Sequence, residues 1–146
     1  MAELGGALAV FATLVYLARQ IRQSNQLAMA QHRETNRITM LDISEPLIRD
    51  PEFAALLHQT AESVEGVSES DLRRVRLHIQ NELLAAQSLF VRGRLMDEER
   101  MERVSGSLAA NIISRHSLAQ ELWQGTEYDA AFVAHVESLL ERRTQQ

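Results

Sequence analysis

The sequence predicts an all-α protein, in which an apolar N-terminal helix, membrane-spanning or buried, continues into a small multi-helix bundle. Three observations support this prediction. Glycine and proline are scarce, with 6 and 2 among 146 residues. Runs of β-branched residues are few, and apolar residues recur at intervals of three and four along most of the chain, which is typical of helices. The expected parts are a helix at 1–21, a stalk helix at 22–49 and a helical bundle at 50–146.

The first helix is predicted from an uncharged, mostly apolar run at 4–18 that is followed by two arginines. A helix over this run is about 22 Å long, and counting from Met1 raises the length to about 27 Å, against ~30 Å for a bilayer core. The arginine side chains can extend the reach to the headgroups. The residues expected to contact the membrane are Leu4, Val10, Phe11, Leu14, Tyr16, Arg19 and Arg22. Because positive charge follows the run, the rest of the chain is expected in the cytoplasm.

Two other interpretations of this helix stay open. It could be buried inside a soluble helical oligomer, or it could be a cleaved signal peptide, since residues 28–30 (Ala-Met-Ala) resemble a cleavage site. Glu3 at the start and the arginines before that site argue against cleavage. Gly5, Ala9 and Thr13 recur every fourth residue and would line a face on which a second helix can approach closely, as in a homo-oligomer. Small residues are also common in any short apolar segment, so this contact face is one of two readings.

The segment YLARQIRQSNQLA at 16–28 resembles the end of the N-terminal membrane helix in a family of uncharacterised bacterial proteins. The matching residues are Tyr16, Leu17, Ala18, Gln20, Ile21, Arg22 and Gln23, whereas Ser24-Asn25 replaces the family's usual Asn-Thr pair. More loosely, residues 50–53, Trp123 and residues 128–140 resemble later parts of the family. The resemblance implies a single-span protein with no assigned activity. With the arginine rule, the expected location is the bacterial inner membrane, with the C-terminal domain in the cytoplasm.

Capping signals predict where the following helices begin and end. The first helix is expected to continue to about Asp42, with a kink or a new start at Ser44-Glu45-Pro46. Asp50-Pro51-Glu52 predicts a helix to about Ser63. Its apolar stripe consists of Phe53, Leu56, Leu57 and Thr60.

The helix that opens at Ser68-Glu69-Ser70-Asp71 has the most regular apolar pattern and is expected at the centre of the core. Its main stripe consists of Leu72, Val75, Ile79, Leu83, Ala86 and Phe90. A second apolar set predicts contact with neighbours on two sides, and consists of Leu77, Leu84, Val91 and Leu95.

Three further features complete the expected bundle. Residues 93–96 (Gly-Arg-Leu-Met) predict a turn, after which Asp97-Glu98-Glu99 begins a helix. Gly106 with its flanking serines either weakens that helix or permits a close helix crossing. A short helix from Ser117 to Trp123 ends at Gly125, and the last helix runs from Glu127 to Arg142.

No catalytic or metal-binding motif is found in the sequence. GxSxG, P-loop, GxGxxG and HExxH patterns are absent, so we expect no cofactor and no metal, and the sequence leans against an enzyme. Cysteine is also absent, which removes disulfides and thiolate metal sites. The formal net charge of −5 gives no general attraction to phosphate backbones, so no nucleic-acid partner is expected.

A ligand pocket in the bundle would require several dispersed polar and aromatic residues to converge, which spacing cannot show. The candidates are Arg73, Arg76, His78, Glu82 and Trp123. His78 and Glu82 share a helix face, but a solvent-facing histidine is the simpler interpretation of the pair. The sequence therefore favours a membrane-anchored interaction or scaffold module that binds a protein partner or itself. The alternative is a bundle that binds a small apolar ligand or hosts an unrecognised enzyme site.

Overall fold

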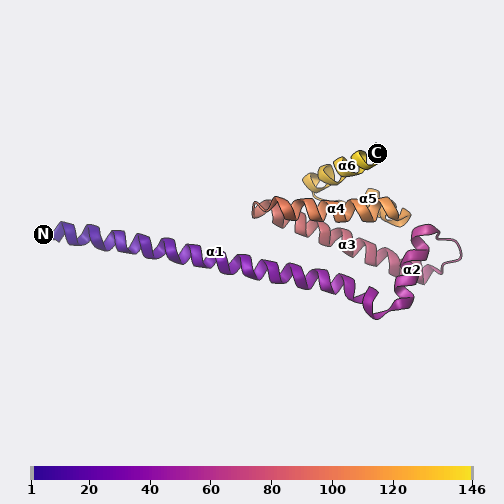
Figure 1. Ribbon diagram of the computed structural model, residues 1–146, viewed down its shortest axis with the longest axis horizontal. Helices are drawn as coiled ribbons and strands as arrows, with labels where there is room; N and C mark the ends of the chain where they lie inside the picture. Colours follow the sequence, from indigo (N-terminus) through magenta and orange to yellow (C-terminus); the bar gives the residue numbers. More distant parts are fainter. Residues whose placement is uncertain (1, 146) are drawn as a thin grey trace. The chain divides into compact units, whose positions relative to one another are not determined.

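The computed structural model describes residues 2–145, which form helices joined by short connections (Figure 1). The elements are α1 (Ala2–Arg49), α2 (Pro51–Glu62), α3 (Glu69–Leu95), α4 (Glu99–Arg115), α5 (Ser117–Gly125) and α6 (Ala130–Thr144). No strand occurs within residues 2–145. The all-α prediction is confirmed.

The chain divides into two compact units, Met1–Ile38 and Thr39–Gln146. The first unit is the N-terminal part of α1, in which side chains are described at 11, 13–28, 30, 31, 34, 35 and 38. Among the described residues, no helix is both long and apolar enough to cross a membrane. Residues 1–10, where the predicted anchor begins, lie outside the side chains that the structure describes.

The helix α1 continues through Pro46 to Arg49, so the new start expected at Ser44-Glu45-Pro46 is not where this helix ends. A proline inside a helix removes one donor from the ladder and crowds the preceding turn. The Pro46 carbonyl still accepts a hydrogen bond from the Asp50 amide at 3.0 Å. The break comes one turn later, where Asp50 caps α2.

The predicted caps of α2 and α3 are confirmed. Asp50 Oδ1 accepts a hydrogen bond from the Phe53 amide at 2.9 Å, and Ser68 Oγ accepts one from the Asp71 amide at 3.1 Å. The other Asp50 oxygen accepts a 2.6 Å charge-assisted hydrogen bond from Arg74 on α3. This hydrogen bond is the main cause that lowers the pKa of Asp50. One carboxylate therefore starts α2 and ties it to α3.

The turn between α3 and α4 lies later than residues 93–96, where the sequence predicts it. Gly93 is buried inside α3, where a Cβ would lie 3.1 Å from the Glu102 amide nitrogen, so glycine lets α4 approach closely. The reversal is made by Asp97, whose φ is 56°. The Glu98 amide donates to the Gly93 carbonyl at 2.8 Å, which is the bond pattern of a Schellman motif.

The core lies on one side of α3, against α2, α4, α5 and α6. As predicted, the main stripe of α3 faces the core: Leu72 is half-buried and the later members are buried, with Val75 and Leu83 at 0% exposure. The facing side chains are Phe53, Ala109, Ala110, Ile113, Leu118, Ala119, Phe132 and Val136. The second stripe is not covered within the described residues, since Leu77 is 53% and Leu95 81% exposed. Two-sided packing of α3 was therefore a wrong prediction, because the other helices of the bundle share its one face.

At Gly106 the backbone of α4 comes close to side chains of α6. A Cβ at this position would overlap the imidazole of His135 and would lie 3.3 Å from Cδ1 of Leu139. Gly106 is fully inside α4 and buried. The close helix crossing predicted as one of two options at this glycine is thus confirmed.

Candidate functional site

A pocket with a volume of about 320 Å³ lies among the end of α1, α2, α3 and the α4–α5 junction. Its walls are mainly aliphatic, formed by Leu47, Ala54, Leu57, Ala61, Ile79 and Ile112. Five polar residues also line it, namely His58, Glu82, Asn111, Arg115 and His116. An apolar pocket with a few polar groups is the usual form of a small-molecule site.

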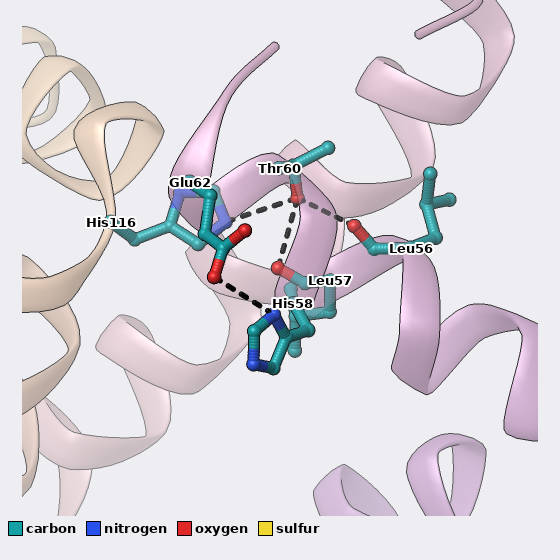
Figure 2. A network of polar contacts seen from close by, with 6 residues as sticks. All are labelled: Leu56, Leu57, His58, Thr60, Glu62 and His116. Atoms are coloured by element: carbon teal, nitrogen blue, oxygen red, sulfur yellow. Dashed lines mark hydrogen bonds and ion pairs between the residues drawn. The ribbon is translucent and has the colours of Figure 1, made fainter.

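A buried polar network lies beside this pocket, shares Leu57 and His116 with its lining, and joins α2 to the α4–α5 junction (Figure 2). The Thr60 hydroxyl lies 2.9 Å from the Leu56 carbonyl oxygen and 3.1 Å from that of Leu57. The same hydroxyl oxygen lies 3.2 Å from Nε2 of His116. Thr60 is 0% and His116 6% exposed. Their polar atoms therefore contact each other and the helix carbonyls in place of water.

The network assigns the proton of the His116 ring. The Thr60 hydroxyl has one proton, and when it donates this proton to a helix carbonyl, its oxygen accepts from Nε2 of His116. Nδ1 of His116 is buried and has no hydrogen-bond partner among the described residues. Protonating Nδ1 would bury an unpaired donor, and burial accordingly lowers the pKa of His116. Burial therefore favours the neutral imidazole, and the contact with Thr60 favours the tautomer with its proton on Nε2.

Glu82 is the acidic group of the pocket, and few groups around its carboxylate could balance the negative charge. Its side chain is 20% exposed, and burial raises its pKa. Among the described residues, the group of basic type within 4.0 Å of this carboxylate is His78, whose Nε2 lies 3.6 Å from Oε1 of Glu82 and which is charged only when protonated. This distance is too long for a hydrogen bond. Burial also lowers the pKa of His78, so His78 is a poor counter-charge.

The mouth of the pocket is more polar than its walls. Arg115 is exposed and forms no ion pair with a described residue. His58 is 78% exposed, and its Nδ1 lies 3.8 Å from a Glu62 carboxylate oxygen one turn along α2; Figure 2 shows this contact beside the Thr60 network. Charges at the mouth are screened by solvent, unlike the carboxylate in the wall.

The five pocket candidates taken from the sequence do not converge. Glu82 alone lines the pocket described above. Arg73 is exposed, and Arg76 is exposed and paired with Glu121 of α5 at 3.1 Å. Trp123 stacks on the Tyr128 ring at 4.7 Å and lines a separate cleft of about 610 Å³ beside α6.

His78 is 8% exposed and packs edge-on against Phe53. The expectation of a solvent-facing histidine was therefore wrong. Its position on α3 lies next to Ile79 and one turn after Val75, on the buried side of the helix.

The residues expected to contact a membrane are exposed where the structure describes them. Phe11 is 67%, Leu14 59% and Tyr16 65% exposed, and Arg19, Arg22 and Thr13 are also exposed. The side chains of Leu4, Gly5, Ala9 and Val10 lie outside the described residues. Two of the three residues of the face proposed at Gly5, Ala9 and Thr13 thus lie outside the described side chains, and this face stays a prediction.

Sequence reasoning missed Thr60 and His116 as a pair, because 56 residues separate them. The available signal was a threonine in an otherwise apolar stripe of α2. Among the described residues, no group of three or more potential ligands could hold a metal ion. Comparisons with models of known protein families, with curated proteins and with solved structures each found no match.

Proposed function

We propose that the protein is a membrane-anchored helical module of the bacterial inner membrane, whose cytoplasmic bundle binds a protein partner or a second copy. In this proposal residues 1–21 are the anchor, residues 22–49 the stalk and residues 50–146 the bundle. The resemblance of residues 16–28 to a family with a membrane helix supports the same assignment.

The observation that carries the proposal is the exposure of apolar side chains around the whole circumference of α1 near its start. Leu14, Val15, Tyr16 and Leu17 are 59%, 42%, 65% and 45% exposed. Neighbouring positions on a helix point about 100° apart, so four consecutive side chains point around the whole helix. Phe11 and Ile21, at 67% and 62%, extend this surface. Apolar surface on every side of a helix has to be covered by lipid or by partner helices. The uncharged residues from Leu4 onward lengthen the run.

Extraction of membranes with alkaline carbonate tests the anchor. The full chain is expected in the pellet, and a variant lacking residues 1–21 is expected in the supernatant. Recovery of the full chain in the supernatant would overturn the proposal. Mass photometry of that fraction would then show whether the chain forms a soluble oligomer with the N-terminal helix buried.

The pocket supports a second function, the binding of a small apolar ligand by the bundle. The supporting observation is a concave, mainly aliphatic surface that also contains a partly buried carboxyl group. Its volume is near the lower limit of ~300–1,000 Å³ for small-molecule sites. The ligand is therefore expected to be compact.

Filling the pocket tests this second function. Ala54 lines the pocket, so Ala54→Phe should remove binding of a small apolar probe such as hexanol, observed as shifts of backbone amide resonances. Ala134, an exposed alanine of α6, gives the matched control Ala134→Phe. Equal responses of the two variants would show that the probe binds elsewhere.

A further inference from the structure

We infer that the pocket among α2, α3 and α4 binds a compact apolar amine, whose ammonium group pairs with the Glu82 carboxylate. This inference rests on the second proposed function, ligand binding by the bundle. It adds the chemical class of the ligand.

The first step is the lack of a permanent counter-charge at Glu82. No arginine nitrogen of the described residues lies within 4.0 Å of its carboxylate, and the only charged-type contact is the 3.6 Å approach of His78 Nε2. Burial raises the pKa of Glu82 and lowers the pKa of His78, because it disfavours the charged form of each group. A buried carboxylate without a cation is costly. A ligand that brings a cation would remove that cost.

The second step concerns the sign of the ligand's charge. An ammonium group can donate charge-assisted hydrogen bonds to Glu82, whose side chain is only 20% exposed. A carboxylate ligand would place two acids together, and one of them would have to take up a proton. Arg115 and His58 do not reverse this preference, because both side chains are exposed at the mouth and their fields are screened by solvent. The negative charge of Glu82 in the pocket wall therefore favours a ligand with a positive charge.

The third step concerns the remainder of the ligand. Leu57 of α2, Ile79 of α3 and Ile112 of α4 line the pocket from three helices. These side chains offer no hydrogen bonds, so the part of the ligand beyond its ammonium group should be apolar. A volume of about 320 Å³ suits a short alkyl or single-ring amine. Polyamines and sugars would leave polar groups unpaired against the aliphatic walls.

Three probes of equal chain length, hexylamine, hexanol and hexanoate, test the inference on the full-length protein. Amide chemical shifts of the pocket residues would be followed at pH 7, with Glu82→Gln compared in the same preparation. Partitioning of the probes into any lipid or detergent present is then the same for both proteins. Exposed Glu127 gives the control Glu127→Gln, which removes the same charge outside the pocket.

Hexylamine is expected to bind the parent about tenfold or more tightly than hexanol. Both can donate a hydrogen bond to Glu82, but only the ammonium group adds the attraction of opposite charges. Glu82→Gln should lose this preference, and Glu127→Gln should keep it. Equal binding of hexylamine and hexanol to the parent, or tighter binding of hexanoate, would overturn the inference and leave ligand binding standing. Failure of all three probes to shift the pocket resonances would overturn both proposals together.

Discussion

Nε2 of His116 lies 3.2 Å from the hydroxyl oxygen of Thr60, which joins α2 to the junction of α4 and α5. The hydroxyl donates to its own helix and accepts from the imidazole, so each group depends on the other. Both are buried. Removing the hydroxyl would leave the Nε2 proton without an acceptor.

Replacing Thr60 with valine should therefore destabilise the protein although the two side chains have nearly the same shape. The expected loss is ~1–3 kcal/mol, the cost of leaving a buried donor unpaired. Urea unfolding followed by circular dichroism would measure it. Thr60→Ser keeps the hydroxyl and should retain the hydrogen bond to His116. A valine variant as stable as the parent would contradict the role assigned to this network.

Stability should fall as the pH drops below about 6.5, the ordinary pKa of histidine. Burial lowers the pKa of both His78 and His116 in the folded protein. The unfolded chain therefore takes up protons at a higher pH than the folded protein, and the equilibrium shifts toward unfolding. Urea unfolding at a series of pH values between 8 and 4.5 would measure the change.

Glu82 acts in the opposite direction and provides an internal control. Its pKa is raised from 4.5 by burial, so the folded protein takes up this proton more readily than the unfolded chain. Its contribution is favourable at low pH and is lost as the pH rises. The acid-side loss of stability should consequently be steeper in Glu82→Gln than in the parent. Parallel pH profiles for the two proteins would contradict the assignment.

Adjacent leucines of α3 should respond very differently to an acidic substitution. Leu83 is 0% exposed and Leu84 is 37% exposed. Leu83→Asp buries an unpaired carboxylate, which is expected to cost several kcal/mol, comparable to the whole stability of a small domain. Leu84→Asp leaves its carboxylate in water and should retain the fold. Thermal unfolding would compare the midpoints of the two variants. Similar midpoints would show that the buried face of α3 is wrongly assigned.

Gly106→Ala should destabilise the contact between α4 and α6 by ~1–3 kcal/mol, the usual cost of overpacking. The added methyl group would overlap the His135 ring. Combining it with His135→Ala should relieve part of this cost, and a double-mutant cycle would measure the coupling. Gly125→Ala is the control, since nothing lies within 4 Å of a Cβ there. Additive effects of the two α4–α6 substitutions would argue against the overlap.

The sequence predicts the helices well because their signals are local. The cap at Asp50, the cap at Ser68 and the regular stripe from Val75 to Phe90 each depend on residues a few positions apart, and the structure confirms them. Gly93 was misplaced in a turn for the opposite reason. Its role depends on Met101 and Glu102 of the next helix, which no local pattern around Gly93 indicates.

The pocket was the least predictable part, because its lining residues come from four helices. Glu82 was identified from its spacing to His78, but the burial of this pair depends on Phe53, which packs on His78 from α2. Thr60 and His116 show no shared pattern in the sequence. Leu77 and Leu84 belong to an apolar stripe and yet are exposed, because an apolar pattern does not indicate whether another helix of the chain covers it.

The short connection between α3 and α4 also bears on how the chain folds. Asp97 reverses the chain directly after α3, and Gly93 then lies against Met101 and Glu102. These contacts close only a small loop and form between neighbours in the sequence, so their entropic cost is low. We therefore expect the α3–α4 hairpin to form early in folding and α6 to dock onto it later through Gly106. Substitutions in the hairpin should slow folding, whereas those on α6 should mainly accelerate unfolding.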